Sequence, residues 1–165
     1  MVDLVYLETT VVGHVAGRIH PNLHIASRQH KTRRWWATAK SNYRLFISQL
    51  VIDECGTGDP TAAQERLNEI AGLPRRDVID DVRDLADALM ARHAIPKSEP
   101  RDALHVAIAA VHAVEYLATW NFKHIANATL RTKINDVIRD YGYAAPVICT
   151  PEELAGMVDD PNDAD

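Results

Sequence analysis

The sequence predicts an α/β protein in three layers, with helices on both faces of a mainly parallel central sheet of four to five strands. Two observations support this fold class. Short β-prone runs alternate along the chain with longer segments of helical periodicity. Polar side chains directly follow several of these runs, as expected where parallel strands end. With 165 residues, the chain fits one domain, expected over residues 1–157, followed by an acidic tail at 158–165 that is predicted to be disordered.

The expected strands are short runs rich in β-branched, aromatic and other apolar residues. The first is the run DLVYL at 3–7, and the second is RLFI at 44–47. Val78–Ile79 is expected as a short third strand. Tyr116–Thr119 and Pro146–Cys149 complete the predicted sheet.

The expected helices begin at prolines or capping side chains and end at glycines. Thr9 or Thr10 is predicted to cap a short first helix that reaches about Ala16. Later helices are expected over about 22–39, 49–55, 61–71, 80–93, 100–113, 130–141 and 151–154. The helix at 100–113 is almost wholly apolar, so Asp102 in its first turn is expected at the rim of the core.

The charge of the chain is unevenly distributed. The formal net charge is −5, yet no Asp or Glu occurs between Thr9 and Ile52. The basic residues of that stretch are Arg18, Arg28, Lys31, Arg33, Arg34, Lys40 and Arg44. Such a block favours a polyanion such as RNA, or an acidic protein, as a partner. The alternative is a solvated helix face.

Several classes of protein are disfavoured by composition. The two cysteines, Cys55 and Cys149, lie far apart and form no CxxC pair, so neither a disulfide framework nor a zinc motif is expected. The N-terminus lacks the pattern of a signal peptide, and no apolar run approaches the roughly 20 residues of a membrane span. We therefore expect a cytoplasmic protein without a membrane partner.

Three acids fall where a parallel sheet could gather them at one edge. Glu8 follows the first strand, Glu54 lies on the helix after the second, and Asp102 opens the apolar helix. Clustered carboxylates in apolar surroundings repel one another unless a cation lies among them, and such oxygen ligands suit Mg²⁺ or Mn²⁺. Taken singly, each acid is better explained as a helix-terminal or surface charge than as a site residue.

The set resembles the PIN domain, a metal-dependent ribonuclease fold best known in the toxins of VapBC-type toxin–antitoxin pairs. Four stretches carry the likeness, and together they span nearly the whole chain: VYLETTVVG, FISQLVIDE, RDALHVAIAA and EYLATWNFKHIAN. The last two are the most specific. The resemblance implies a VapC-like endoribonuclease toxin that hydrolyses RNA phosphodiester bonds with Mg²⁺ or Mn²⁺. It also implies an antitoxin protein as partner and a homodimer as a common assembly.

By this resemblance, Glu8, Glu54, Asp102 and Asn121 are the catalytic and metal-binding residues. Two of them depart from the usual pattern, which has Asp at the first and fourth positions. Glu8 reaches one methylene further, and Asn121 supplies an amide oxygen without charge. Three formal charges in place of four favour one bound ion over two.

The resemblance also suggests residues that contact the substrate. Thr9, Thr10 and Thr119 are expected to position water or phosphate, and Lys123 to contact the RNA backbone. The basic stretch adds two further candidates for the RNA backbone, Arg33 and Arg34. The neighbouring Trp35 and Trp36 could stack on a base, but burial of at least one is the favoured interpretation.

Other interpretations remain open. A catalytically weakened PIN module that binds RNA or a protein is the main alternative, because of Glu8 and Asn121. A phosphoacceptor receiver domain ranks last, since no strand ends in a suitable Asp. His105, three residues after Asp102, could orient a carboxylate, although local packing is the preferred interpretation.

Overall fold

The protein folds around a five-stranded, all-parallel sheet with the strand order β3-β2-β1-β4-β5. The structure is a computed structural model and describes residues 2–156. The strands are β1 (Leu4–Leu7), β2 (Arg44–Ser48), β3 (Arg75–Arg76), β4 (Tyr116–Ala118) and β5 (Val147–Cys149). The predicted α/β fold class is confirmed.

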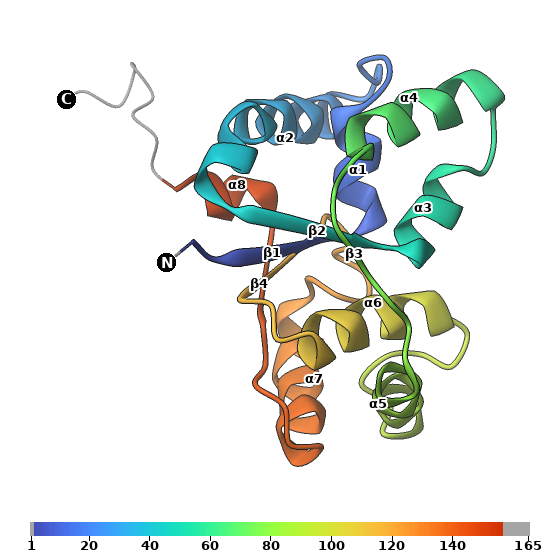
Figure 1. The fold of residues 1–165 in the computed structure, drawn as a ribbon, viewed down its shortest axis with the longest axis vertical. Coiled ribbons are helices and arrows are strands. Elements are labelled where there is room, and N and C mark those ends of the chain that lie inside the picture. The colour runs from blue at the N-terminus through green and yellow to red at the C-terminus, as the bar shows by residue number, and fades with distance from the viewer. Residues whose placement is uncertain (1, 157–165) are drawn as a thin grey trace.

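Helices cover both faces of the sheet, giving the three predicted layers (Figure 1). One layer contains α1 (Thr9–Val15), α2 (Leu23–Asn42), α3 (Gln49–Cys55), α4 (Pro60–Ile70) and α8 (Pro151–Ala155). The other contains α5 (Asp80–Ala91), α6 (Pro100–Val111) and α7 (Ala128–Asp140). No helix within residues 2–156 is both long enough and apolar enough to span a membrane.

The core lies on both sides of the central strand β1. Val5, Tyr6 and Leu7 are fully buried, as expected for a parallel strand covered by helices on each face. The apolar helix α6 buries all of its residues from His105 to Ala110 against this sheet and against α5. Because α6 is buried, its packing against the sheet and α5 stabilises it as a helix despite its low polarity.

The strand order reverses at β1. The chain passes from β1 to β2 and β3 on one side, then crosses to β4 and β5 on the other. Parallel α/β sheets form their binding crevices at such a reversal, outside the carboxyl ends of the strands. Glu8 follows β1 and Thr119 follows β4, so the two residues flank this point.

Three predicted boundaries were wrong. The third strand is β3, because the backbone of Arg75 and Arg76 pairs with the end of β2, whereas Ile79 caps α5. Charged side chains are tolerated there because β3 is an edge strand. The first helix is capped by the Glu8 side chain and not by a threonine. Helix α2 continues three residues past Ala39. The predicted disordered tail lies outside the described residues.

Candidate functional site

Glu8 is a buried carboxylate at the carboxyl end of the central strand. Its side chain is only 4% exposed, and it caps α1 by accepting a hydrogen bond from the Thr10 backbone N–H at 3.1 Å. The hydroxyls of Thr10 and Thr119 also donate to the same oxygen, Oε2, the latter at 2.9 Å. All three bonds reach Oε2, so Oε1 is left available to another ligand.

Glu54 is held by the end of a buried hydrogen-bonded chain. Its Oε1 accepts from Thr9 Oγ1 at 2.8 Å and from His105 Nε2 at 2.6 Å. The other ring nitrogen, Nδ1, lies 2.8 Å from the Tyr6 hydroxyl, which in turn lies 2.8 Å from Ser48 Oγ. Because a carboxylate can only accept, Nε2 donates to Glu54, and in the neutral ring Nδ1 accepts from Tyr6.

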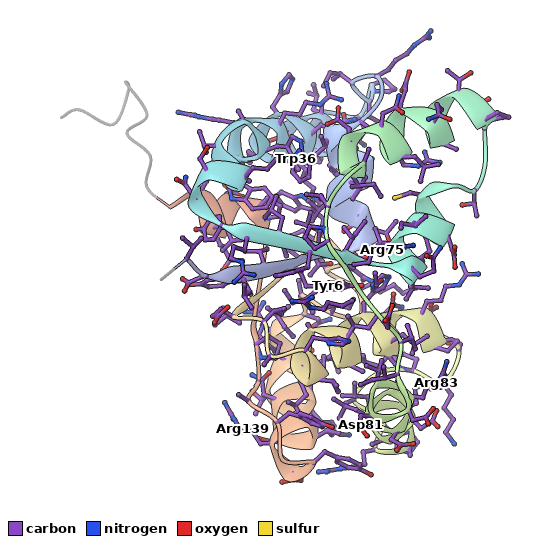
Figure 2. The ribbon with its side chains drawn as sticks, viewed as in Figure 1. Tyr6, Trp36, Arg75, Asp81, Arg83 and Arg139 are labelled. Atoms are coloured by element: carbon purple, nitrogen blue, oxygen red, sulfur yellow. The ribbon has the colours of Figure 1, made fainter. Side chains whose placement is uncertain are left out.

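The ionisation of these groups fits that direction. Burial opposes ionisation of Glu54, but the hydrogen bonds from His105 and Thr9 and the nearby positive charges bring its pKa below the usual range. Burial strongly raises the pKa of Tyr6, which lies between the sheet and α6 (Figure 2), so its hydroxyl stays a donor. His105 therefore orients Glu54, a role that extends beyond the local packing preferred from sequence.

Asp102 belongs to a second group of ligand atoms at the start of α6. Within residues 2–156, only Glu99, Asp102 and His124 form a set of three or more His, Cys, Asp or Glu side chains with ligand atoms all within 4.8 Å of one another. His124 Nε2 lies 3.7 Å from Glu99 Oε1. Burial raises the pKa of Asp102, and the charges of Glu8 and Glu99 raise it further, whereas Asn121 and His124 lower it.

Asn121 links this group to the strand end. Its backbone N–H donates to Thr119 Oγ1 at 2.9 Å, and its side-chain Oδ1 accepts from the His124 backbone N–H at 3.1 Å. The remaining amide NH₂ interacts with Asp102 and lowers the pKa of that carboxyl. In this arrangement, Asn121 orders the 121–124 turn and lowers the pKa of Asp102, and one lone pair of its side-chain oxygen accepts the His124 N–H.

The four predicted ligands thus gather at one sheet edge without forming one compact set. Glu8 is close enough for its charge to raise the pKa of Asp102, and Thr9 and Thr10, adjacent on α1, hold Glu54 and Glu8. Among the described residues, however, the tight cluster pairs Asp102 with Glu99 and His124 instead of Glu8 and Glu54. A cation shared by Glu8, Glu54 and Asp102 would require these side chains to move closer together.

The predicted substrate-binding residues fall into three groups: three threonines, two exposed basic residues and Arg33. The hydroxyls of Thr9, Thr10 and Thr119 are hydrogen-bonded to the glutamates, and Thr119 is fully buried, so these residues position carboxylates. Lys123 and Arg34 are exposed. Arg33 donates to the backbone carbonyls of His14 and Gly17, at 3.4 and 2.6 Å, so it joins α2 to the end of α1.

Sequence reasoning missed Glu99, His124 and the role of Tyr6. Glu99 is three residues before Asp102, and His124 is three residues after Asn121, so each lies one turn from a predicted site residue. That spacing was the available signal. Tyr6 gave none, because a tyrosine within an apolar strand is indistinguishable from an ordinary core residue.

Comparison of the chain with protein-family models, with curated proteins and with solved structures gives no match. The residues and their geometry are therefore the basis for any assignment of function.

Proposed function

We propose that the protein is a metal-dependent endoribonuclease of the PIN type, acting as the toxin of a toxin–antitoxin pair. One observation carries the proposal: Glu8, Glu54 and Asp102 come from three separate elements to the edge of the sheet at the strand-order reversal. Each is held by buried or half-buried polar partners, a costly arrangement for surface acids of no function. Three of the four stretches that resemble PIN motifs supply these residues, and the fourth supplies Asn121.

The donor atoms suit a hard divalent cation. Oε1 of Glu8 and Oε2 of Glu54 receive no hydrogen bond within residues 2–156. Burial, and then the negative charges of Glu8 and Glu99, raise the pKa of Asp102, and a bound cation would offset those charges. Asp102 belongs to both sets of candidate ligands: the predicted set with Glu8 and Glu54, and the tight cluster with Glu99 and His124. We favour one Mg²⁺ or Mn²⁺. When bound, the cation would polarise a phosphoryl oxygen and lower the pKa of water.

The other residues of the site would position these carboxylates and the RNA. His105 and Thr9 keep Glu54 ionised and oriented, and the hydroxyls of Thr10 and Thr119 orient Glu8. Asn121 holds the turn that leads to Lys123 and His124. The exposed ammonium of Lys123 is two residues from Asn121, within reach of a phosphate at the site.

The test is cleavage of a mixed RNA pool by the purified protein with Mn²⁺ or Mg²⁺, beside an EDTA control. We expect cleavage by the wild type and its loss in Asp102→Asn. Asp81→Asn is the matched control, because Asp81 is an exposed acid in the first turn of α5, in the same helical layer as Asp102 but outside the carboxylate site (Figure 2). Intact cleavage by Asp102→Asn, or none by a folded wild type, would overturn the proposal.

A second candidate function has one observation in its favour. Asn121 is an uncharged amide that lowers the pKa of Asp102, where the PIN pattern has a carboxylate. A weakened PIN module would bind RNA or a protein partner with little turnover. RNA binding by the wild type without cleavage in either metal supports this alternative, whereas Asn121→Asp should then increase turnover.

The toxin assignment needs its own test, because nuclease activity alone does not establish it. We expect induced expression of the wild type to arrest growth, and Asp102→Asn to grow normally. Co-expression of the product of a small upstream reading frame should restore growth by forming a stable complex. Unimpaired growth with active nuclease present would separate the enzyme from a toxin role.

A further inference from the structure

An exposed aromatic ring stands beside the carboxylate site. Phe122 is 42% exposed although it immediately follows Asn121. The Arg28 guanidinium from α2 lies 4.8 Å from the centre of its ring and 5.8 Å from that of Trp120. Trp120 meets Phe122 edge to face at 5.9 Å and stacks on His14 of α1. We refer to Phe122, Arg28, Trp120 and His14 as the Phe122 platform.

The platform is fixed to the site by hydrogen bonds. The Trp120 indole N–H donates to the buried hydroxyl of Thr32 at 2.8 Å, and the Trp120 backbone N–H donates to Thr10 Oγ1 at 2.9 Å. Thr10 is the residue whose hydroxyl holds Glu8. The Phe122 backbone N–H donates to the Trp120 carbonyl at 2.9 Å. These bonds fix Trp120 and the backbone of Phe122, so the Phe122 ring extends from an ordered segment that is attached to the residues that hold Glu8.

The core does not account for this exposure. The hydrophobic core takes Trp120, 5% exposed, but leaves Phe122 outside. Two basic side chains lie near the ring. Arg28, from the acid-free stretch between Thr9 and Ile52, lies against it, and Lys123 is the next residue in the chain. An exposed ring next to cations suits a ligand that has both a flat apolar face and negative charge.

We propose that an unpaired base of the substrate RNA stacks on Phe122, with Arg28 beside the phosphate of that nucleotide. The proposal rests on the proposed nuclease function and names how that site takes hold of its substrate. Every base has a π-face, so the platform would select single-stranded over paired RNA and discriminate weakly among bases. The position of the ring next to Asn121 places the stacked nucleotide adjacent to the bond to be cleaved.

The test measures binding of a fluorescent ten-residue oligouridylate by anisotropy, with Asp102→Asn as the cleavage-deficient background. We expect Phe122→Leu to weaken binding about tenfold, since removing a base–aromatic stack costs that order of affinity. Phe122→Trp should retain or strengthen binding. Tyr141→Leu is the matched control, because Tyr141 is also an exposed ring, 52% against 42% for Phe122, and lies at the end of α7.

The outcomes separate this proposal from the nuclease assignment. Equal affinity of the Leu and Phe proteins, with unchanged thermal melting, overturns the stacking proposal even if the wild type cleaves RNA. In the wild-type background, stacking predicts that Phe122→Leu raises KM more than it lowers kcat. If the wild type does not cleave RNA but Phe122→Leu still weakens oligouridylate binding tenfold, the nuclease proposal is overturned and the stacking of a base on Phe122 is supported. Absence of any oligouridylate binding overturns the platform.

Discussion

Two carboxylates of the site have opposite pKa shifts, and the cause lies in their immediate partners. Glu54 receives donors from His105 and Thr9, so the charged form is favoured despite its burial. Asp102 is buried beside the charges of Glu8 and Glu99, which favour its protonated form. Removing the negative charge should therefore stabilise the fold at Asp102 and destabilise it at Glu54.

We predict that Asp102→Asn raises the melting temperature in EDTA at pH 7 while abolishing cleavage. A carboxyl whose pKa is raised on folding contributes stability at low pH that is lost as the pH rises through the folded-state pKa. At neutral pH the ionised Asp102 thus opposes folding, and the neutral isostere relieves that cost. Calorimetry of both proteins checks this. A lower melting temperature for the variant would show that Asp102 is mainly a structural acid.

We predict the opposite for Glu54→Gln, which keeps an oxygen for Thr9 and His105 but removes the charge. The lowered pKa of Glu54 contributes stability that is present above the ordinary glutamate value, near 4.5, and is lost as the pH falls through the folded-state pKa. The wild type should be more stable than the variant at pH 7, and the difference should shrink toward pH 3. Urea denaturation at several pH values measures it. A difference independent of pH would mean that the charge is not its source.

At this scale the sequence singled out Glu8, Glu54 and Asp102 as candidates, because Glu8 follows a strand, Glu54 lies on the helix after the second strand and Asp102 is in the first turn of a helix. Their assignment as metal ligands stays a prediction. It could not reveal His124 as a neighbour of Asp102 and Glu99, since that proximity depends on how the 121–124 turn folds back on α6. It also could not show which carboxylate oxygens of Glu8 and Glu54 accept hydrogen bonds, or that the side-chain oxygen of Asn121 accepts one. Hydrogen-bond direction is a property of packed side chains and has no periodic pattern.

Among the elements, those with strong patterns were predicted and the weak one was not. The apolar helix α6 and the strands β1, β2 and β4 follow from hydrophobic runs, and Pro100 marks the start of α6. Strand β3 has only two residues, both arginines, and exists because the end of β2 pairs with it. A tertiary pairing of that kind overrides local propensity, so Val78–Ile79 was the better guess from sequence and was wrong.

One buried hydroxyl, that of Thr32, joins α2 to Trp120, two residues after β4. Thr32 Oγ1 is fully buried, donates to the Arg28 carbonyl and accepts from the Trp120 indole at 2.8 Å. We predict that Thr32→Val lowers the free energy of unfolding by about 1–3 kcal/mol, because the indole N–H loses its partner within the core. Urea denaturation measures the loss. Thr38→Val, an exposed position on the same helix, is the control and should change stability little.

Across the whole molecule, charge is concentrated on two helices in different layers. Helix α2 carries five basic residues and no acid, whereas α5 in the other layer carries exposed aspartates such as Asp81 (Figure 2). The carboxylate site lies at the sheet between the two layers. We expect a polyanion that approaches this site to be attracted by α2 and repelled by α5, so the charge distribution would orient an RNA strand along α2.

This orientation predicts how binding responds to salt. For single-stranded RNA, each phosphate neutralised contributes about −0.7 to the slope of log K against log salt. Lys123→Gln and Arg34→Gln should each make the slope less steep by about that amount, because both side chains are exposed on or beside the basic layer. Arg139→Gln, at the end of α7 in the opposite layer (Figure 2), removes the same charge from the chain and should leave the slope unchanged. Anisotropy titrations between 50 and 200 mM salt, about the range over which such slopes are measured, decide between the variants. An equal effect of all three would indicate attraction by net charge alone, and RNA would then have no fixed path across α2.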